Sequence, residues 1–192
     1  MDWDAKVAAA GDCVFFDWYL AYAHLAPHLT PVLAAYGSEC EIFIPGCGIS
    51  DVGFELYTNG YHNITNVDIS AVAIGRMQQA QVARNAVDAM EFHCLDVLEV
   101  PNLVPPNLFD VVFDKGLMDA LLCNLKTNVE DTFAYLAGMY QLLRRGGTFV
   151  LVTHSATRLC YLEHPTFAWK VIRQGVVDRN GRAYHLFFCV KS

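Results

Sequence analysis

Residues 41–50 have the sequence Glu41-Ile-Phe-Ile-Pro-Gly-Cys-Gly-Ile-Ser50, in which an apolar run passes directly into a glycine-rich turn. The run predicts a buried strand, and Gly46 and Gly48 predict a turn where a ligand can approach the backbone. A Gly-x-Gly turn alone is weak evidence, but Asp68 follows Gly46 by 22 residues, at the end of the next predicted strand. At that spacing an acidic residue reaches ribose hydroxyls in Rossmann-like sites, so we expect a nucleoside-containing cofactor here.

Short β-type runs alternate with helical stretches on both sides of this segment. Continuous apolar strands are typical of a parallel sheet that is covered on both faces. A Ser70 cap begins the helix predicted over Ala71–Asn85, and the glycines after Arg145 end the one predicted over Val129–Leu143. The predicted strands are Glu41–Pro45, Ile64–Asp68, Glu91–Cys94, Phe109–Asp114 and Thr148–Thr153.

The pattern changes after the fifth predicted strand. Two β-type runs, Phe167–Val177 and Arg182–Lys191, are joined by Asp178-Arg-Asn-Gly181, and Asn-Gly is a strong hairpin signal. The fold class we predict is therefore α/β: a Rossmann-like, seven-stranded, mostly parallel sheet with helices on both faces and a C-terminal antiparallel hairpin. No repeat or Gly/Ser linker interrupts the chain, so we expect one domain over 1–192, with 1–37 as a cofactor lid and substrate segment and 38–192 as the catalytic core.

The third position of the glycine pattern separates two kinds of cofactor. It is occupied by Asp51, so the Gly-x-Gly-x-x-Gly fingerprint of dinucleotide sites is broken. A helix that begins with Asp51 and Glu55 binds a pyrophosphate poorly, because the two carboxylates offset the positive end of the helix dipole that would attract the phosphates. S-adenosylmethionine carries no phosphate, and its sulfonium and ammonium cations suit an acidic pocket. The sequence therefore favours this cofactor over a nicotinamide, which remains a remote alternative.

Further polar residues follow the third and fourth predicted strands, at the sheet edge where open α/β folds bind ligands. Asp96 is our candidate acceptor for the exocyclic amine of adenine. Asp114, Lys115 and Asp119 follow the fourth strand within the segment Phe109-Asp-Val-Val-Phe-Asp-Lys-Gly-Leu-Met-Asp119. Of these, Asp119 and Asp114 are the candidate catalytic residues, since either could orient a methyl acceptor, as could a tyrosine such as Tyr161.

These motifs together resemble class I S-adenosylmethionine-dependent methyltransferases. More narrowly, they are similar to the elongation factor 1-alpha lysine methyltransferases related to the endothelin-converting-enzyme-2 locus, which show a GCGNS turn, VDYS and EKGTLDALL. The counterparts here are Gly46-Cys-Gly-Ile-Ser50, Val67-Asp-Ile-Ser70 and Asp114-Lys-Gly-Leu-Met-Asp-Ala-Leu-Leu122. The Lys-Gly-x-x-Asp-Ala-Leu-Leu string is the most specific of the three, and the resemblance covers nearly the whole chain.

The N-terminal elements Trp3-Asp4 and Asp17-Trp18-Tyr19 also match the family's YWDxRY opening and its DWF or EWY element. Val7 replaces the closing tyrosine of the opening motif, and Lys6 replaces its arginine. These departures affect the expected lid over the methionine end of the cofactor. With Gly48 from the turn, the cofactor contacts implied by the resemblance are Trp3, Trp18, Gly46, Asp68, Ile69, Asp96, Val97 and Lys115.

The aromatic residues Phe15, Phe16, Trp18 and Tyr19 allow two interpretations. They could close over the sulfonium by cation–π attraction, or they could lie on a helix that packs against the sheet, which we favour for Phe15 and Phe16. The histidines lack ligand spacing and no two of the seven cysteines form a CxxC pair, so we expect no metal site. Cys47 in the turn is explained by its small size.

Composition bounds the function further. The chain has 192 residues, 54% of them hydrophobic, and no stretch approaches the roughly 20 apolar residues of a membrane span. The start lacks the basic residues of a targeting peptide, so we expect a cytoplasmic protein, with the nucleus as an alternative, and no membrane partner. The net charge is −7, yet residues 144–192 hold 8 Lys/Arg against 2 Asp/Glu. This basic segment could bind an anionic partner or only solvate the outer strands.

We expect methyl transfer to a protein lysine or amino group, which the resemblance alone implies. A lysine has an ordinary pKa of about 10.4, so on the order of 0.1% is neutral at about pH 7.4 and the site must favour the neutral amine. The first alternative is an RNA methyltransferase acting on an mRNA cap or an adenosine, motivated by Arg144, Arg145, Arg158, Lys170 and Arg173. Pro105-Pro106 does not replace the Asp/Asn-Pro-Pro-aromatic motif of many adenine enzymes. The second alternative is a non-catalytic binding subunit with this fold.

Overall fold

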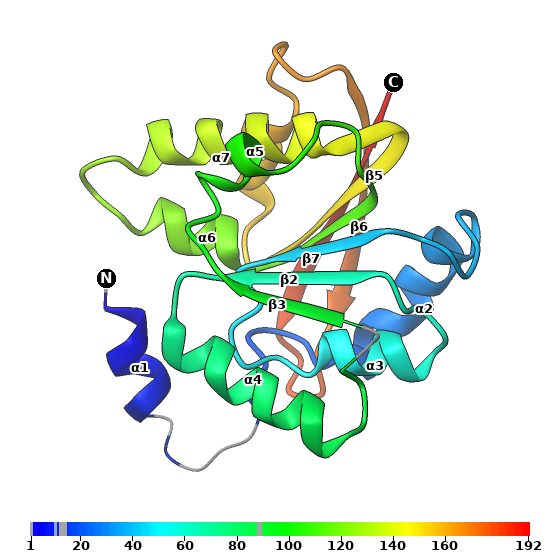
Figure 1. Cartoon of the computed structure of the whole chain (residues 1–192). Coiled ribbons are helices and arrows are strands. Elements are labelled where there is room, and N and C mark those ends of the chain that lie inside the picture. The colour runs from blue at the N-terminus through cyan, green and yellow to red at the C-terminus, as the bar shows by residue number, and fades with distance from the viewer. Residues whose placement is uncertain (1, 10, 12–14, 88–89) are drawn as a thin grey trace.

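The computed structural model describes residues 2–9, 11, 15–87 and 90–192, and its centre is one seven-stranded sheet (Figure 1). The strand order is β3-β2-β1-β4-β5-β7-β6. The strands are β1 (Ile42–Pro45), β2 (Ile64–Asp68), β3 (Met90–Cys94), β4 (Phe109–Lys115), β5 (Leu143–Thr153), β6 (Trp169–Val177) and β7 (Ala183–Lys191). The first five are parallel, whereas β7 is antiparallel to both β5 and β6, which confirms the predicted fold class.

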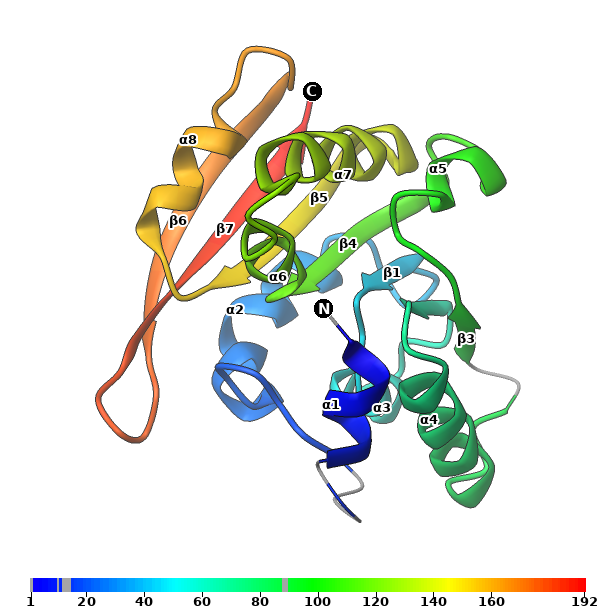
Figure 2. The ribbon, with the colours of Figure 1, turned by 90° about the vertical axis from the view of Figure 1, so that its left-hand side faces the viewer.

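Helices cover both faces of the sheet (Figure 2). The α-helices are α1 (Trp3–Ala9), α2 (Tyr22–Ala34), α3 (Val52–Thr58), α4 (Ala71–Ala83), α5 (Val100–Leu103), α6 (Leu117–Leu122), α7 (Asn128–Leu142) and α8 (Leu159–Leu162), with a 3₁₀ turn η1 (Ala156–Arg158) before α8. Within the described residues, no helix has the length and apolar character needed to cross a membrane.

Side chains point alternately to the two faces of the sheet, so the core consists of two clusters of buried residues. In β1, Ile42 and Ile44 pack into the cluster that includes α2, α3 and α4, whereas Phe43 packs into the cluster that includes α7. All four residues of β1 are buried, as expected for a central parallel strand covered on both sides. Because packing on both faces holds β1 in place, the glycine turn that follows it has a fixed position at the end of the sheet.

The predicted helix ends agree with the structure to within two residues. The Ser70 hydroxyl accepts a hydrogen bond of 3.1 Å from the Ala73 amide and caps α4 as expected. Strand β5 begins at Leu143, five residues before its predicted start, because a register shift between Phe109 and Val111 lets Leu143 pair with β4.

The prediction of a helix for the aromatic residues near position 15 is wrong. Residues 15–21 form no helix, and the first helix after them is α2. Phe15 packs edge-on against Phe54 with ring centroids 5.7 Å apart, and Phe16 packs against Trp18 at 5.3 Å. The segment instead crosses the carboxyl end of the sheet. A hydrogen bond from the Phe16 amide to the Ile49 carbonyl holds the segment in place.

Candidate functional site

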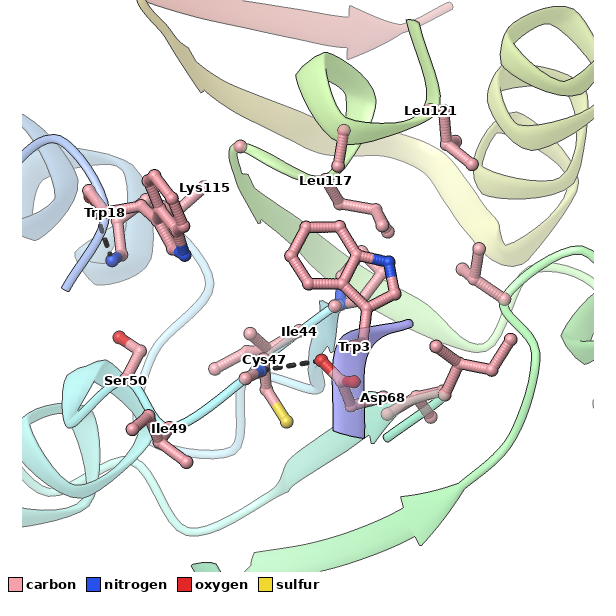
Figure 3. Close-up of a pocket in the computed structure, with 18 of the residues that line it drawn as sticks. Trp3, Trp18, Ile44, Cys47, Ile49, Ser50, Asp68, Lys115, Leu117 and Leu121 are labelled. Atoms are coloured by element: carbon pink, nitrogen blue, oxygen red, sulfur yellow. Dashed lines mark hydrogen bonds between the residues drawn. The ribbon is translucent and has the colours of Figure 1, made fainter. Parts of the chain in front are cut away.

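A cavity of about 580 Å³ opens at the carboxyl ends of β1, β2 and β4 (Figure 3). Its size is within the range of roughly 300–1,000 Å³ typical of small-molecule sites. Every residue that the sequence nominated for cofactor contact lines it, namely Trp3, Trp18, Gly46, Gly48, Asp68, Ile69, Asp96, Val97 and Lys115. The structure therefore brings residues from the N-terminal segment and four different strand ends into one site, while their contact with a cofactor stays a prediction.

The glycine turn forms the floor of this cavity. Gly46 has φ +63°, and a Cβ there would lie 2.9 Å from the Cβ of Leu117 at the start of α6. Only glycine satisfies both the left-handed backbone and this close approach. Gly48 also has a positive φ, but a Cβ there would meet nothing within 4 Å. The turn thus packs tightly against α6 at its first glycine and is open at its second.

Asp68 is fixed by backbone amides at the end of β2. Its Oδ2 accepts a hydrogen bond of 2.8 Å from the Gly48 amide, and its Oδ1 accepts one of 2.8 Å from the Ser70 amide. Burial raises the pKa of this carboxyl, and the two amide hydrogen bonds oppose that shift. Each oxygen keeps further acceptor capacity, so the carboxylate can bind a pair of hydroxyl groups in the cavity.

Helix α1 lies beside α4 and contributes to the cavity wall (Figures 1 and 2). Asp4 attaches it, because its Oδ1 accepts hydrogen bonds of 2.6 Å from the Ser70 hydroxyl and 3.2 Å from the Val72 amide. Trp3 then lies above Asp68 in the cavity (Figure 3). Val7, which replaces the tyrosine of the related family, also lines the cavity, so this position is apolar here.

Lys115 lines the cavity, and its ammonium is held by the N-terminal segment. Its Nζ lies 2.6 Å from Asp17 Oδ1 and donates to the Trp18 carbonyl at 3.2 Å. Asp17 Oδ1 also accepts from the Ser50 hydroxyl. Burial lowers the pKa of Lys115, and the Asp17 carboxylate opposes that shift. This buried ion pair joins the segment before α2 to the end of β4.

Asp51 was expected to make the pocket acidic. The structure places it at the N-terminal end of α3, outside the set of described residues that line the cavity. Burial, together with the neighbouring Asp17 carboxyl, raises the pKa of Asp51 to about 6. Asp51 and Asp17 therefore lie behind the cavity lining, whereas Asp68 is the carboxylate that both contacts the glycine turn and lines the cavity.

The candidate catalytic residue Asp114 is fully buried within the core. Its carboxylate accepts hydrogen bonds from the Leu117 amide at 2.8 Å, the Met118 amide at 3.0 Å and the Tyr135 hydroxyl at 2.8 Å. Burial raises its pKa to about 7. These contacts cap α6 and attach it to α7, so the placement of Asp114 favours a structural role.

Asp119, the other candidate catalytic residue, is the centre of a polar cluster that we call the Asp119 cluster: Tyr19, Asp119, Thr153, His154 and Arg158. Asp119 accepts hydrogen bonds from Tyr19 Oη at 2.9 Å, Thr153 Oγ1 at 2.7 and 2.9 Å, and Arg158 Nε at 2.6 Å. His154 Nδ1 lies 3.0 Å from its Oδ2. Burial raises the pKa of Asp119, but the hydrogen bonds from Arg158, Thr153 and Tyr19 outweigh it, so the pKa is lowered.

The Asp119 cluster adjoins the cavity without lining it. The ring of Tyr19 packs on Gly116, where an added Cβ would lie 3.1 Å from Tyr19 Cε2, and Gly116 lines the cavity. Of this cluster, the sequence motifs indicated only Asp119 as a candidate catalytic residue; no motif or spacing pointed to His154 or joined Arg158 to Asp119. Tyr161, also considered as an acceptor-side residue, packs against Phe133 instead.

Arg144 and Arg158, two of the basic C-terminal residues, lie at opposite ends of β5. Arg144 forms an ion pair with Asp110 at 2.9 Å near the start of β5, whereas Arg158 pairs with Asp119 beyond the end of that strand. Lys170 is level with Val190, which pairs with Thr148 near the middle of β5. Two of the five cations that motivated an RNA substrate are therefore neutralised by internal carboxylates at opposite ends of the sheet.

Comparison with known proteins identifies the family. The model of the family described as "Methyltransferase domain" matches residues 38–174, and the chain belongs to this family of S-adenosylmethionine-dependent methyltransferases. Among curated proteins, "EEF1A lysine methyltransferase 4" of Mus musculus is 29% identical over 99% of this chain and 74% of its own length. The human "eEF1A lysine and N-terminal methyltransferase" is 31% identical over 72% of this chain but only 19% of its own length.

Solved structures share the fold at low sequence identity. Magnesium protoporphyrin IX methyltransferase from Synechocystis superposes with a TM-score of 0.69 at 13% identity, covering 99% of this chain and 93% of that one. TrmN from Thermus thermophilus gives 0.65 at 19% identity, covering 85% of this chain and 48% of that one. The enzyme class and its cofactor, S-adenosylmethionine, are thus those that the sequence motifs indicated, and a nicotinamide does not fit this family.

Proposed function

We propose that the protein transfers a methyl group from S-adenosylmethionine to a lysine or amino-terminal amine of a protein. The proposal rests on one observation above all: the mouse relative, named as an eEF1A lysine methyltransferase, aligns with 99% of this chain. The longer relatives share this domain over about a fifth of their length, and their name also includes N-terminal methylation. A protein amine is the acceptor class common to these names.

The cavity residues fit the cofactor. Asp68 is oriented by two backbone amides and would bind the ribose hydroxyls, and Asp96, whose Oδ1 accepts from the Leu98 amide at 3.0 Å, would bind the adenine amine. Gly46 and Gly48 add no side chain of their own to the floor, and Trp3 and Trp18 would cover the ligand from the N-terminal segment. When bound, S-adenosylmethionine supplies a methyl group activated by its sulfonium. The product left after transfer is S-adenosylhomocysteine.

The protein's part in the reaction is alignment, exclusion of water and control of one proton. Methyl transfer is an in-line displacement, so the acceptor nitrogen must lie opposite the sulfur with its lone pair free. The Asp119 cluster adjoins the cavity through Gly116 and supplies the titratable groups on that side. Asp119 is our candidate for the residue that organises the acceptor side.

An RNA acceptor is less well supported by the placement of charge. Arg144 and Arg158 each bind an internal carboxylate, and they lie at opposite ends of β5. Phosphate binding depends on several free cations along one surface and weakens steeply with salt. RNA therefore remains as an outcome of the test below.

The test is transfer of tritium-labelled methyl groups from S-adenosylmethionine into a cell lysate, split afterwards into protease-treated and ribonuclease-treated halves. An Asp68→Ala variant defines the background. We expect label that depends on Asp68 and is lost only to protease. Label lost only to ribonuclease would make RNA the acceptor, and no Asp68-dependent label in either half would remove the macromolecular acceptor altogether.

A further inference from the structure

An aspartate–histidine pair lies at the carboxyl ends of β4 and β5. The Tyr19 hydroxyl donates to Asp119 Oδ2 at 2.9 Å, so the hydroxyl's proton points at the carboxylate. His154 Nδ1 lies 3.0 Å from the same oxygen, and a carboxylate can only accept. The proton of the neutral imidazole is therefore on Nδ1, which leaves Nε2 with a free lone pair.

Neither Asp119 nor Tyr19 is able to accept a proton from a substrate. Asp119 is 4% exposed and its oxygens are occupied by donors from four side chains. Burial and the charge of Asp119 raise the pKa of Tyr19, so its hydroxyl stays protonated. The His154 side chain, by contrast, is 53% exposed, and among the described residues no hydrogen bond engages its Nε2.

The contacts of His154 connect its ring to the cofactor cavity through Tyr19. The ring of His154 packs against that of Tyr19 with centroids 5.8 Å apart, and Tyr19 packs on the cavity residue Gly116. Trp18, the neighbour of Tyr19 in the chain, lines the cavity. Parallel strands present their carboxyl ends at one edge, so the residue after β5 faces the same opening as the residues after β4.

We propose that His154 Nε2 takes the proton from the acceptor ammonium and that Asp119 is the positioning residue that holds the imidazole in this tautomer. The inference rests on the proposed amine acceptor and names the group that prepares it. In the first step the N–H bond of the ammonium breaks, its electron pair stays on nitrogen and the proton moves to Nε2. The neutral amine then forms an N–C bond with the methyl carbon as the C–S bond breaks, with that pair going to sulfur. His154 afterwards releases its proton to water.

The charges around the imidazole come from four elements of the structure. Asp119 stabilises the protonated ring from α6, and Arg158 of η1 balances part of that charge at 2.6 Å from Asp119. His185 on β7 pairs in register with Thr153 and contacts Arg173 of β6 at 3.1 Å. The titratable groups that face His154 directly are Tyr19, Asp119 and His185. Behind them, Tyr184 packs on Tyr19, Arg158 binds Asp119 and Arg173 contacts His185.

The test compares the wild type with His154→Gln across pH, with the protein acceptor that the wild type labels and saturating S-adenosylmethionine. The variant should lose roughly 100-fold in kcat at about pH 7, within the range of general-base catalysis. The deficit should narrow at least about ten-fold by about pH 9.5, where roughly a tenth of a lysine with a pKa of about 10.4 is already neutral. His62→Gln is the matched control, because His62 is an exposed histidine before β2, at the opposite edge of the sheet.

A second measurement separates catalysis from folding. The Kd for S-adenosylmethionine should change less than about two-fold in His154→Gln, and Asp119→Asn should show the same pH-dependent deficit as His154→Gln. A deficit of equal size at every pH, or none, overturns the proposal. If the wild type labels no protein at all, the proposed function fails and this inference falls with it, a result distinct from an active wild type with an unaffected variant.

Discussion

The Gly48 amide and the Asp68 carboxylate are joined by a hydrogen bond of 2.8 Å that links the turn after β1 to the end of β2. The two residues are 20 positions apart, and the parallel pairing of Pro45 with Val67 brings them to the same height. The bond orients one carboxylate oxygen, and the Ser70 amide orients the other. This geometry holds Asp68 ready for a pair of hydroxyl groups before any ligand arrives.

Asp68→Ala should therefore weaken S-adenosylmethionine binding by at least about 30-fold, since charge-assisted hydrogen bonds contribute roughly 1.5–3 kcal/mol each. Isothermal titration calorimetry measures the change. Glu163→Gln, which removes an exposed carboxylate after α8, is the control and should bind like the wild type. Equal affinity for Asp68→Ala and the wild type would remove Asp68 from the cofactor site.

Gly46→Ala should both destabilise the protein and abolish cofactor binding. The new Cβ would lie 2.9 Å from the Cβ of Leu117. The alanine backbone would also have to keep a positive φ, which costs about 1–3 kcal/mol for a residue other than glycine. Gly181→Ala is a matched control, because Gly181 also has a positive φ but its Cβ would meet nothing within 4 Å. Urea unfolding should show the larger loss for Gly46→Ala; a loss no larger than that of Gly181→Ala would mean that the contact with Leu117 is unimportant.

Asp4→Ala should release α1 from α4 and leave the sheet intact. The variant loses both hydrogen bonds that Asp4 accepts, from the Ser70 hydroxyl and the Val72 amide, so Trp3 is no longer held over Asp68. We expect the Kd for S-adenosylmethionine to rise about three- to ten-fold, as the loss of one or two hydrogen bonds implies. Unchanged affinity and dissociation rate, measured by tryptophan fluorescence, would show that α1 is not part of the site.

Asp114 should make stability depend on pH between its unfolded and folded pKa values. Burial raises its pKa from 3.8 to about 7, so the folded state holds this proton while the unfolded state releases it. The stabilisation from this group is full below pH 3.8 and is lost as pH rises through about 7. The free energy of unfolding of the wild type, relative to Asp114→Asn, should fall across this window in urea titrations. A constant difference would contradict the raised pKa.

The sequence predicted the sheet well because β1, β4 and the second half of β5 are buried, largely apolar runs, and because polar residues or glycines follow the strands. The cavity residues were found for the same reason: Gly46, Asp68, Asp96 and Lys115 each follow a strand end, and parallel strands bring those ends together. Helix α2 gave a weaker signal. Pro27 and Pro31 lie inside it and remove backbone donors, although its buried Leu25, Leu29 and Leu33 follow helical spacing.

The contacts that organise the acceptor side could not be predicted from spacing. Lys115 pairs with Asp17 across 98 positions, and Tyr19 meets His154 across 135. Tyr19 also adopts φ +68°, a left-handed conformation that an aromatic residue rarely takes and that breaks the expected helix. Such pairs depend on how the N-terminal segment crosses the sheet, and a single sequence has no periodic signal for that path.

The most direct measurement uses unmethylated recombinant eEF1A, the protein that appears in the names of the relatives, as the acceptor, and records its intact mass after incubation with this protein and S-adenosylmethionine. We expect a mass increase of one or more methyl groups, located by peptide fragmentation on a lysine or on the amino terminus, and no increase with Asp68→Ala. An unchanged eEF1A mass, together with Asp68-dependent label in RNA from the lysate, would contradict the claim that the acceptor is a protein amine.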